Sequence, residues 1–334
     1  AARCLPGGKR FRMTAGGVRQ HNFFLGELAM QRTLAAGVLL LLAGGAARGQ
    51  DLPAVVVDTH IHLYDTQREG GVPWPSKQSP LYAPHLPADF KRVALPLGVT
   101  HAVIVEASPL VSDNQWLLDL VRGDGLFLGV VGRLDVADAA FGEQLAALAR
   151  DPRYVGIRVP PKEAVRMDDR QTAANLQTLA EHGLTLDLVI GGVPLDEITA
   201  LAKAYPKLRI VIDHALGKRS DGQAVDAAWQ EQVQRLAACP NVYCKLSGML
   251  EQSAGETASR DAAYYRPVLD VLWKEFGDRR LMYASNWPVV NQRGDYQANL
   301  AIVKAFLKDK PAESRQRCWG QNAIEIYRLG ERVR

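Results

Sequence analysis

Three of the seven histidines stand at the ends of apolar, β-branched runs, where a buried strand would deliver them to a site. His60 and His62 close the run VVVDTHIHL, and His214 closes the run LRIVIDH. Residues two apart on a strand point to the same face, so His60 and His62 project together. Imidazoles are common ligands of divalent transition metals. The pattern predicts one divalent metal ion, Zn²⁺ or Mn²⁺, held by His60, His62 and His214.

The same histidines allow two other interpretations. In a metal-free mechanism they would hold the attacking water and the oxyanion directly. In a purely structural interpretation, His60 and His62 would form a hydrogen-bonded pair in the core, although imidazoles buried without partners are costly.

A further polar group stands where the run RRLMYASNWPVV leaves its strand. We predict a buried strand over Leu281–Ala284, and Pro288 stops the ladder because proline has no N–H to donate. Asn286 is thereby presented at a strand end. Its amide can donate and accept hydrogen bonds, but it cannot exchange a proton near neutral pH as a tuned carboxylate can.

The elements that position these groups alternate along the chain. Amphipathic segments separate most of the apolar runs, which is typical of a parallel sheet covered on both faces. Repetition of such units over about 280 residues predicts an α/β fold, the (β/α)₈ TIM barrel. An open doubly wound sheet is disfavoured because no glycine-rich phosphate fingerprint follows the first run. The eight runs are residues 54–63, 100–107, 126–134, 154–160, 184–191, 208–215, 241–248 and 280–287.

A long stretch rich in proline and glycine, residues 65–90, follows the first run. In a barrel it would lie over the mouth, at the face where active sites form. His85 within it is a candidate substrate contact.

Seven motifs in order resemble one family: VVVDTHIHLYD, YVGIRV, LTLDLVI, LRIVIDHALGK, NVYCKLSG, RRLMYASNWPV and GQNAIEIYRL. Over roughly residues 54–330 the chain resembles the amidohydrolase superfamily, in its amidohydrolase-related lactonase branch. The resemblance implies a TIM barrel and a hydrolase that opens the lactone of a sugar acid or a related small carboxylate. A metal-dependent decarboxylase of the same superfamily is the alternative enzyme.

Three positions carry over from the family pattern beyond the histidines. Arg158 matches an arginine that binds a substrate carboxylate or lactone carbonyl, for which its planar fork is suited; a structural ion pair with an interior acid is the alternative. Lys245 would polarise a carbonyl, or else pack against Asp187. Asp187 stands where other amidohydrolases place a further metal histidine, so a binuclear centre is not expected.

Asn286 departs from the family, whose strand-eight motif is Ser-Asp-Trp-Pro with the aspartate resembling a general base. Three explanations remain. Another group, His214, Glu106 or a water ionised by the metal, takes the base role. Alternatively, the lactone is activated and Asn286 orients water or the oxyanion. In the third, the site binds a ligand without turnover, as a pseudoenzyme. Trp287 is expected to wall the pocket, or else to belong to the core.

The charge is unevenly distributed along the chain. Residues 1–49 hold seven Lys and Arg and one acid, which leaves 33 basic and 35 acidic residues in 50–334. The slightly acidic remainder gives no electrostatic case for nucleic acid, so we expect a small-molecule substrate as the partner. The oligomeric state is left open by the sequence.

The basic segment has the layout of a leader. A cationic start near Met30 precedes the apolar run LAAGVLLLLAGGAA, which is too short to span a bilayer. We therefore expect an upstream extension over 1–29, a signal peptide over 30–49 and the barrel over 50–334. The cleaved protein would be periplasmic or secreted, with no stable membrane association.

This layout predicts a mature N-terminus near Gln50, since small residues flank Arg48 before it. N-terminal sequencing of protein from its natural host checks the prediction. Soluble cytoplasmic protein that still carries residues 30–49 would contradict it.

Overall fold

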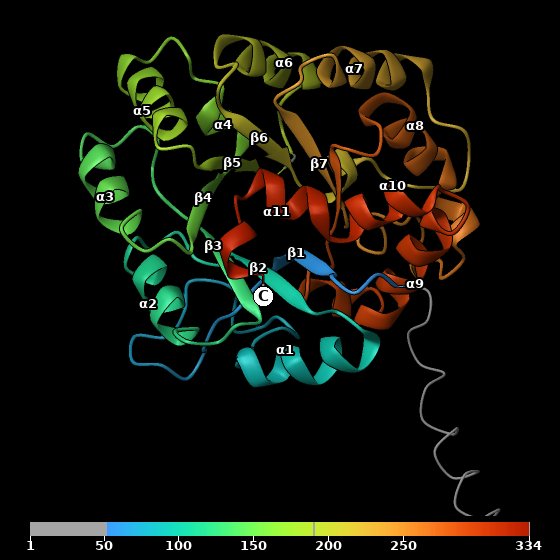
Figure 1. Cartoon of the computed structure of the whole chain (residues 1–334), viewed down its shortest axis with the longest axis horizontal. Coiled ribbons are helices and arrows are strands. Elements are labelled where there is room, and N and C mark those ends of the chain that lie inside the picture. Colours follow the sequence, from blue (N-terminus) through green and yellow to red (C-terminus); the bar gives the residue numbers. More distant parts are fainter. Residues whose placement is uncertain (1–51, 190, 334) are drawn as a thin grey trace, which may run out of the picture. The chain divides into compact units, whose positions relative to one another are not determined.

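The computed structural model describes residues 52–189 and 191–333. Its eight parallel strands pair in chain order, β1 with β2 and onward to β8. Figure 1 shows the strands grouped at the centre with helices around them. The strands are β1 Val57–Ile61, β2 His101–Val105, β3 Phe127–Gly132, β4 Tyr154–Val159, β5 Thr185–Leu188, β6 Arg209–Ile212, β7 Val242–Leu246 and β8 Leu281–Tyr283. The predicted TIM barrel is confirmed.

The sheet is drawn closed by the residues that follow β1 and β8. His62 N donates to Trp287 O at 2.7 Å, and Asn286 N donates to His60 O at 2.9 Å. Asp58 of β1 adds a second tie, because its carboxylate accepts from Ser285 N at 2.9 Å. Closure thus joins the His-x-His motif directly to the SNWP segment, which lies more than 220 positions further along the chain.

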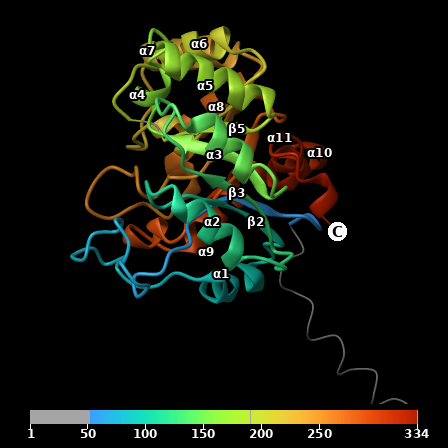
Figure 2. The ribbon, with the colours of Figure 1, turned by 90° about the vertical axis from the view of Figure 1, so that its left-hand side faces the viewer.

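Helices connect the strands, and Figures 1 and 2 show them distributed around the sheet. The amphipathic segments of the sequence correspond to α2, α3, α5, α6 and α7, as expected. The helices are α1 Pro87–Ala94, α2 Ser112–Leu120, α3 Phe141–Leu148, α4 Pro161–Ala164, α5 Arg170–Glu181, α6 Leu195–Ala204, α7 Ala227–Ala237, α8 Arg266–Phe276, α9 Tyr296–Leu307, α10 Ala312–Gln316 and α11 Asn322–Ile326.

The C-terminal segment covers the end of the barrel opposite the polar strand ends, and Figure 1 shows α11 lying across it. Ile326 and Tyr327 join Val57, Val103 and Val211 in one buried apolar cluster. This leaves the carboxyl ends of the strands as the open face, where TIM-barrel sites form.

The predictions for residues 1–29 and 30–49 lie outside the described residues. Among the helices that the structure does describe, none has the length and apolar character needed to cross a membrane.

Candidate active site

An open cavity of about 640 Å³ lies at the carboxyl ends of the strands. Nearly every strand contributes to it a residue from its last positions or from the loop that follows. Its lining includes His62, Trp74, Glu106, Arg133, Arg158, Glu163, His214, Glu251 and Asn286. Polar groups that are far apart in sequence therefore meet around one space large enough for a small molecule.

The predicted histidines come together at the base of this cavity. The Nε2 atoms of His60 and His62 lie 3.2 Å apart. The His214 ring lies 4.5 Å from that of His60, centroid to centroid. His62 Nδ1 lies 3.0 Å from the carbonyl oxygen of Val105, which can only accept, so the His62 proton belongs on Nδ1 and the Nε2 lone pair is free.

A buried ion cluster lies behind His60. The Lys245 ammonium donates to Asp187 Oδ2 at 2.6 Å and lies 2.9 Å from Asp213 Oδ1. All three side chains are fully buried. Tyr327 OH also donates to Asp187 Oδ2, at 2.7 Å. One cation is thus shared by two carboxylates on neighbouring strands, and Tyr327 and Thr185 donate further hydrogen bonds to Asp187.

Two placements of the His60 proton satisfy its contacts with this cluster. His60 Nδ1 lies 3.2 Å from Asp213 Oδ1 and 3.3 Å from Lys245 Nζ. With the proton on Nδ1, His60 donates to Asp213, and its Nε2 lone pair faces that of His62. With the proton on Nε2, Lys245 donates to Nδ1 and His60 donates to His62, which is the hydrogen-bonded pair weighed from the sequence.

The first placement fits a divalent metal ion. Two nitrogens bound to tetrahedral Zn²⁺ at about 2.0–2.1 Å are about 3.3 Å apart, close to the observed Nε2 separation of 3.2 Å. Facing lone pairs repel each other, and a metal cation between them would relieve that repulsion. His60, Asp213 and His214 each bring a ligand atom within 4.8 Å of the others, a set that does not include His62. Asp213 Oδ2 is buried without a hydrogen-bond partner among the described residues, so it is available as a ligand for a cation.

The imidazoles are in the protonation state that a metal requires. Burial lowers the pKa of His62 to about 3 and that of His214 to about 4. Burial also holds the pKa of His60 well below its usual range, although Asp213 opposes the shift. All three are therefore neutral near pH 7 and able to offer lone pairs.

Unusual backbone geometry aims two of the predicted residues. His214 has φ 55° and Asn286 has φ 62°, both in the left-handed region. Asn tolerates this region better than most residues, whereas His214 must be held there. Gln252 Nε2 donates to His214 O at 2.7 Å, and Ser247 Oγ lies 2.9 Å from His214 Nδ1. These contacts fix the His214 ring beside the cavity.

Arg158 and Glu106 face the cavity as a pair. Arg158 Nε donates to Glu106 Oε1 at 3.0 Å, and Arg158 Nη2 donates to Glu106 O at 2.6 Å. The remaining nitrogen, Nη1, lies 3.5 Å from His60 Nε2. The ion pair weighed as an alternative is therefore present, yet Arg158 still lines the cavity and directs Nη1 to its base. The carboxylate of Glu106 is engaged with Arg158.

Three predicted substrate contacts lie elsewhere. Lys245 lies behind His60 rather than on the cavity surface, since its strand carries it into the barrel interior between two carboxylates. Trp287 is buried, with its ring 5.5 Å from Phe90 and 5.2 Å from His85, centroid to centroid. Lys245 therefore packs against Asp187, and Trp287 belongs to the core, which were the alternative interpretations of these two residues. His85 forms a β-bridge with Tyr64 within the mouth loop.

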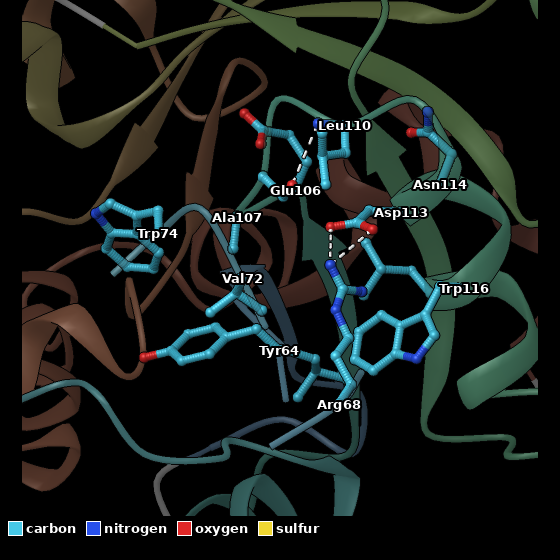
Figure 3. Close-up of a pocket in the computed structure, with 13 residues that line it drawn as sticks. Tyr64, Arg68, Val72, Trp74, Glu106, Ala107, Leu110, Asp113, Asn114 and Trp116 are labelled. Carbon is cyan, nitrogen blue, oxygen red and sulfur yellow. Dashed lines mark hydrogen bonds and ion pairs between the residues drawn. The ribbon is translucent and has the colours of Figure 1, made fainter. Parts of the chain in front are cut away.

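The mouth loop supplies a wall that sequence reasoning missed. Figure 3 shows the loop residues Arg68 and Trp74 beside the segment that follows β2. Arg68 donates from Nη2 to both oxygens of Asp113, at 2.8 and 2.7 Å, and its guanidinium lies 5.1 Å from the centre of the Trp116 ring. This anchor holds Trp74 at the cavity, with its ring 5.8 Å from that of His62. The only signal in the sequence was the place of Trp74 in the loop.

Two further charged residues line the cavity that were not predicted from the sequence, Arg133 and Glu251. Arg133, directly after β3, donates to Glu163 Oε2 at 2.7 Å. Glu251, five positions after β7, accepts a hydrogen bond from Asn286 Nδ2 at 2.7 Å. Arg133 could have been found from its place at a strand end. Glu251 had no signal of that kind, because the fold of its loop brings it in.

The barrel, with histidines from β1 and from the segment after β6 beside an arginine from β4, defines a TIM-barrel protein with a candidate metal centre. The Amidohydrolase family model matches residues 57–329. The chain belongs to the amidohydrolase family, in its lactonase-related branch.

Individual relatives support this assignment. An L-fucono-1,5-lactonase of Burkholderia ambifaria is 32% identical over 281 residues, covering 82% of this chain and 95% of that protein. An L-fucono-1,5-lactonase of Burkholderia multivorans is 25% identical, covering 83% and 97%. The crystal structure of a Burkholderia multivorans amidohydrolase with bound zinc has a TM-score of 0.73 at 24% identity, covers 83% of this chain and 100% of that one, and shows the shared fold.

The buried cluster predicts the effect of Lys245→Met. Burial would lower the pKa of the Lys245 ammonium, but Asp187 and Asp213 outweigh it and raise that pKa. Removing the ammonium leaves both carboxylates buried without their cation, which costs about 3–5 kcal/mol of unfolding free energy near neutral pH. Denaturant unfolding measures the loss.

The loss should depend on pH with a definite sign. In the unfolded variant Asp187 and Asp213 ionise at about pH 4. In the folded variant burial keeps them protonated to higher pH. The unfolding free energy of Lys245→Met should therefore fall as pH rises above that value. Lys203→Met, at an exposed position of α6, is the matched control and should be nearly neutral. Equal effects of the two substitutions would contradict the role of Lys245.

Proposed function

We propose that this protein hydrolyses the lactone of a sugar acid or a related small carboxylate, with one divalent metal ion on the histidine cluster. One observation carries the proposal: the free Nε2 of His62 and the guanidinium of Arg158 face the same cavity. This arrangement would offer a ligand for an electrophilic metal ion and an anion-binding group to one small molecule. The lactonases among the relatives support the choice of a cyclic ester as substrate.

The chain's own residues have separable roles in this reaction. Arg158 is held by Glu106 with its Nη1 directed into the cavity, so little side-chain entropy is lost when substrate binds. Nη1 can then stabilise the negative charge that develops on the lactone carbonyl oxygen. Arg133, paired with Glu163 at the rim, presents guanidinium N–H donors to a carboxylate or polyhydroxylated substrate. Trp74 forms an apolar wall against which a sugar ring can lie.

The metal would be held by His60, His62 and His214, with Asp213 beside them. Bound there, it would polarise the lactone carbonyl and lower the pKa of water. Asp213 orients His60 by accepting from Nδ1, which keeps Nε2 unprotonated. Zn²⁺ and Mn²⁺ are the candidates. We also propose that the barrel is exported after cleavage of its leader.

Loss of two imidazoles should remove the metal. In His60→Ala/His62→Ala, elemental analysis after dialysis should show less than a tenth of the wild-type metal per chain, because two of three nitrogen ligands are gone. His182→Ala, at the end of α5, is the control that keeps the metal. A wild type that carries no metal, and whose turnover resists chelators, would refute the metal site and leave the imidazoles to act directly.

A panel of lactones tests the function itself. The wild type should release protons from five- and six-membered lactones of aldonic acids, measured with a pH indicator at low buffer strength. Aromatic carboxylates in the same assay, monitored for carbon dioxide, test the decarboxylase alternative. Binding of lactones without any turnover would establish the pseudoenzyme instead.

A further inference from the structure

Glu251 is a carboxylate at the cavity, and neither metal binding nor carbonyl polarisation uses it. It lies on the segment between β7 and α8 and lines the same cavity as His62, His214 and Arg158. Its Oε1 accepts from Asn286 Nδ2 at 2.7 Å. Its Oε2 is buried and has no hydrogen-bond partner among the described residues. A buried carboxylate oxygen without a donor calls for a partner that arrives with the substrate or with water.

The surroundings of Glu251 tune its proton affinity. Burial raises the pKa of Glu251 to about 7, and hydrogen bonds from its own backbone and from Asn286 oppose the shift only partly. A group with this affinity can both take and return a proton near neutral pH. The charged and titratable side chains that share a cavity or cleft with it are His62, Glu106, Arg133, Arg158, Glu163, His214, Arg219 and Arg293, and Tyr265 lies close enough to be influenced.

We propose that Glu251 is the general base of this hydrolase and that Asn286 positions it. The inference rests on the proposed lactone hydrolysis. It gives the proton-transfer role to a residue after β7, in place of the carboxylate that the family pattern puts at position 286.

The proton follows a closed path in this scheme. The oxygen of a water molecule bonds to the lactone carbonyl carbon while one water proton passes to the Glu251 carboxylate. The tetrahedral species collapses with cleavage of the bond between that carbon and the ring oxygen. The leaving alkoxide takes the proton from Glu251, which returns to a carboxylate. The product is the open hydroxy acid, whose carboxyl group ionises in solution.

The amide at position 286 follows from this assignment. A carboxylate there would stand within hydrogen-bond distance of Glu251, and two like charges so close in a buried site cannot both ionise freely. The Asn286 amide instead donates to Oε1 and leaves Oε2 free to face the reaction. Asparagine also suits the backbone, since position 286 has φ 62°.

Glu251→Gln tests the role, with Glu256→Gln as the matched control on an exposed position of the same segment. We expect kcat to fall about 10²–10⁴-fold in the first variant, with KM changed far less, and no change in the second. Wild-type kcat should fall as pH drops through about 7, because protonated Glu251 cannot accept a proton. That acid limb should disappear in the residual activity of Glu251→Gln.

A carboxylate exchange makes the test sharper. Glu251→Gln/Asn286→Asp returns the carboxylate to the family position with an amide beside it, and should recover at least tenfold of the lost kcat together with an acid limb. Should Glu251→Gln not fold, Glu251→Asp carries the test: a reduced kcat with the limb kept supports the base, and an unchanged kcat refutes it.

The two hypotheses fail differently. If the wild type opens lactones and Glu251→Gln keeps its rate and pH profile, Glu251 is not the base and the proposed function stands. If the wild type opens no lactone of the panel, the proposed function is refuted, and the hydrolytic role of Glu251 with it.

Discussion

The buried ammonium of Lys245 is the group on which the rest of the site depends. It lies between Asp187 of β5 and Asp213, the residue after β6, while its own position is in β7, so one cation ties three neighbouring strands together. Asp213 then reaches His60 of β1 across the barrel interior. Because these charges are fully buried, each is costly unless an opposite charge lies beside it. That requirement determines the depth and orientation of the strands that carry the histidines.

The same cluster governs the chemistry of His60. Asp213 and Lys245 lie at nearly equal distances from His60 Nδ1, the one able only to accept and the other to donate. The proton of His60 can therefore be drawn to either ring nitrogen, and a cation at the cavity base selects the placement with both Nε2 lone pairs free. The ion cluster and the candidate ligands thus form one network. The charges of Asp213 and Lys245 determine which ring nitrogen of His60 carries the proton and which lone pair is free.

The family motif and this chain differ in where they place a carboxylate. Position 286 is an amide in a left-handed conformation, and the nearby acid comes from Glu251 on the preceding loop. In this chain, one carboxylate and one neutral amide lie side by side at the cavity. The substitution at 286 is therefore compatible with catalysis, since a base needs only to be within reach of the water and suitably tuned.

The sequence by itself determined the barrel and the face that carries the site. Alternating apolar runs and amphipathic segments predicted eight strands with their helices, because periodicity reports which face of an element is buried. The two-residue spacing of His60 and His62, and the places of His214, Arg158 and Asn286 at strand ends, marked residues that the structure brings together. These inferences needed only local geometry and the rule that parallel strands end at one edge.

Only the tertiary structure decided depth and loop conformation. Strand periodicity predicted that the Lys245 side chain points into the barrel, but not how deep it lies. Its ion pairs with two buried carboxylates hold it below the cavity. Trp287 and His85 lie in segments near the mouth, yet aromatic packing turns them inward to support it. Trp74 and Glu251 reach the cavity because contacts from distant segments, Arg68 with Asp113 and Asn286 with Glu251, shape their loops. Such contacts join residues far apart in the chain, so no local pattern could have predicted them.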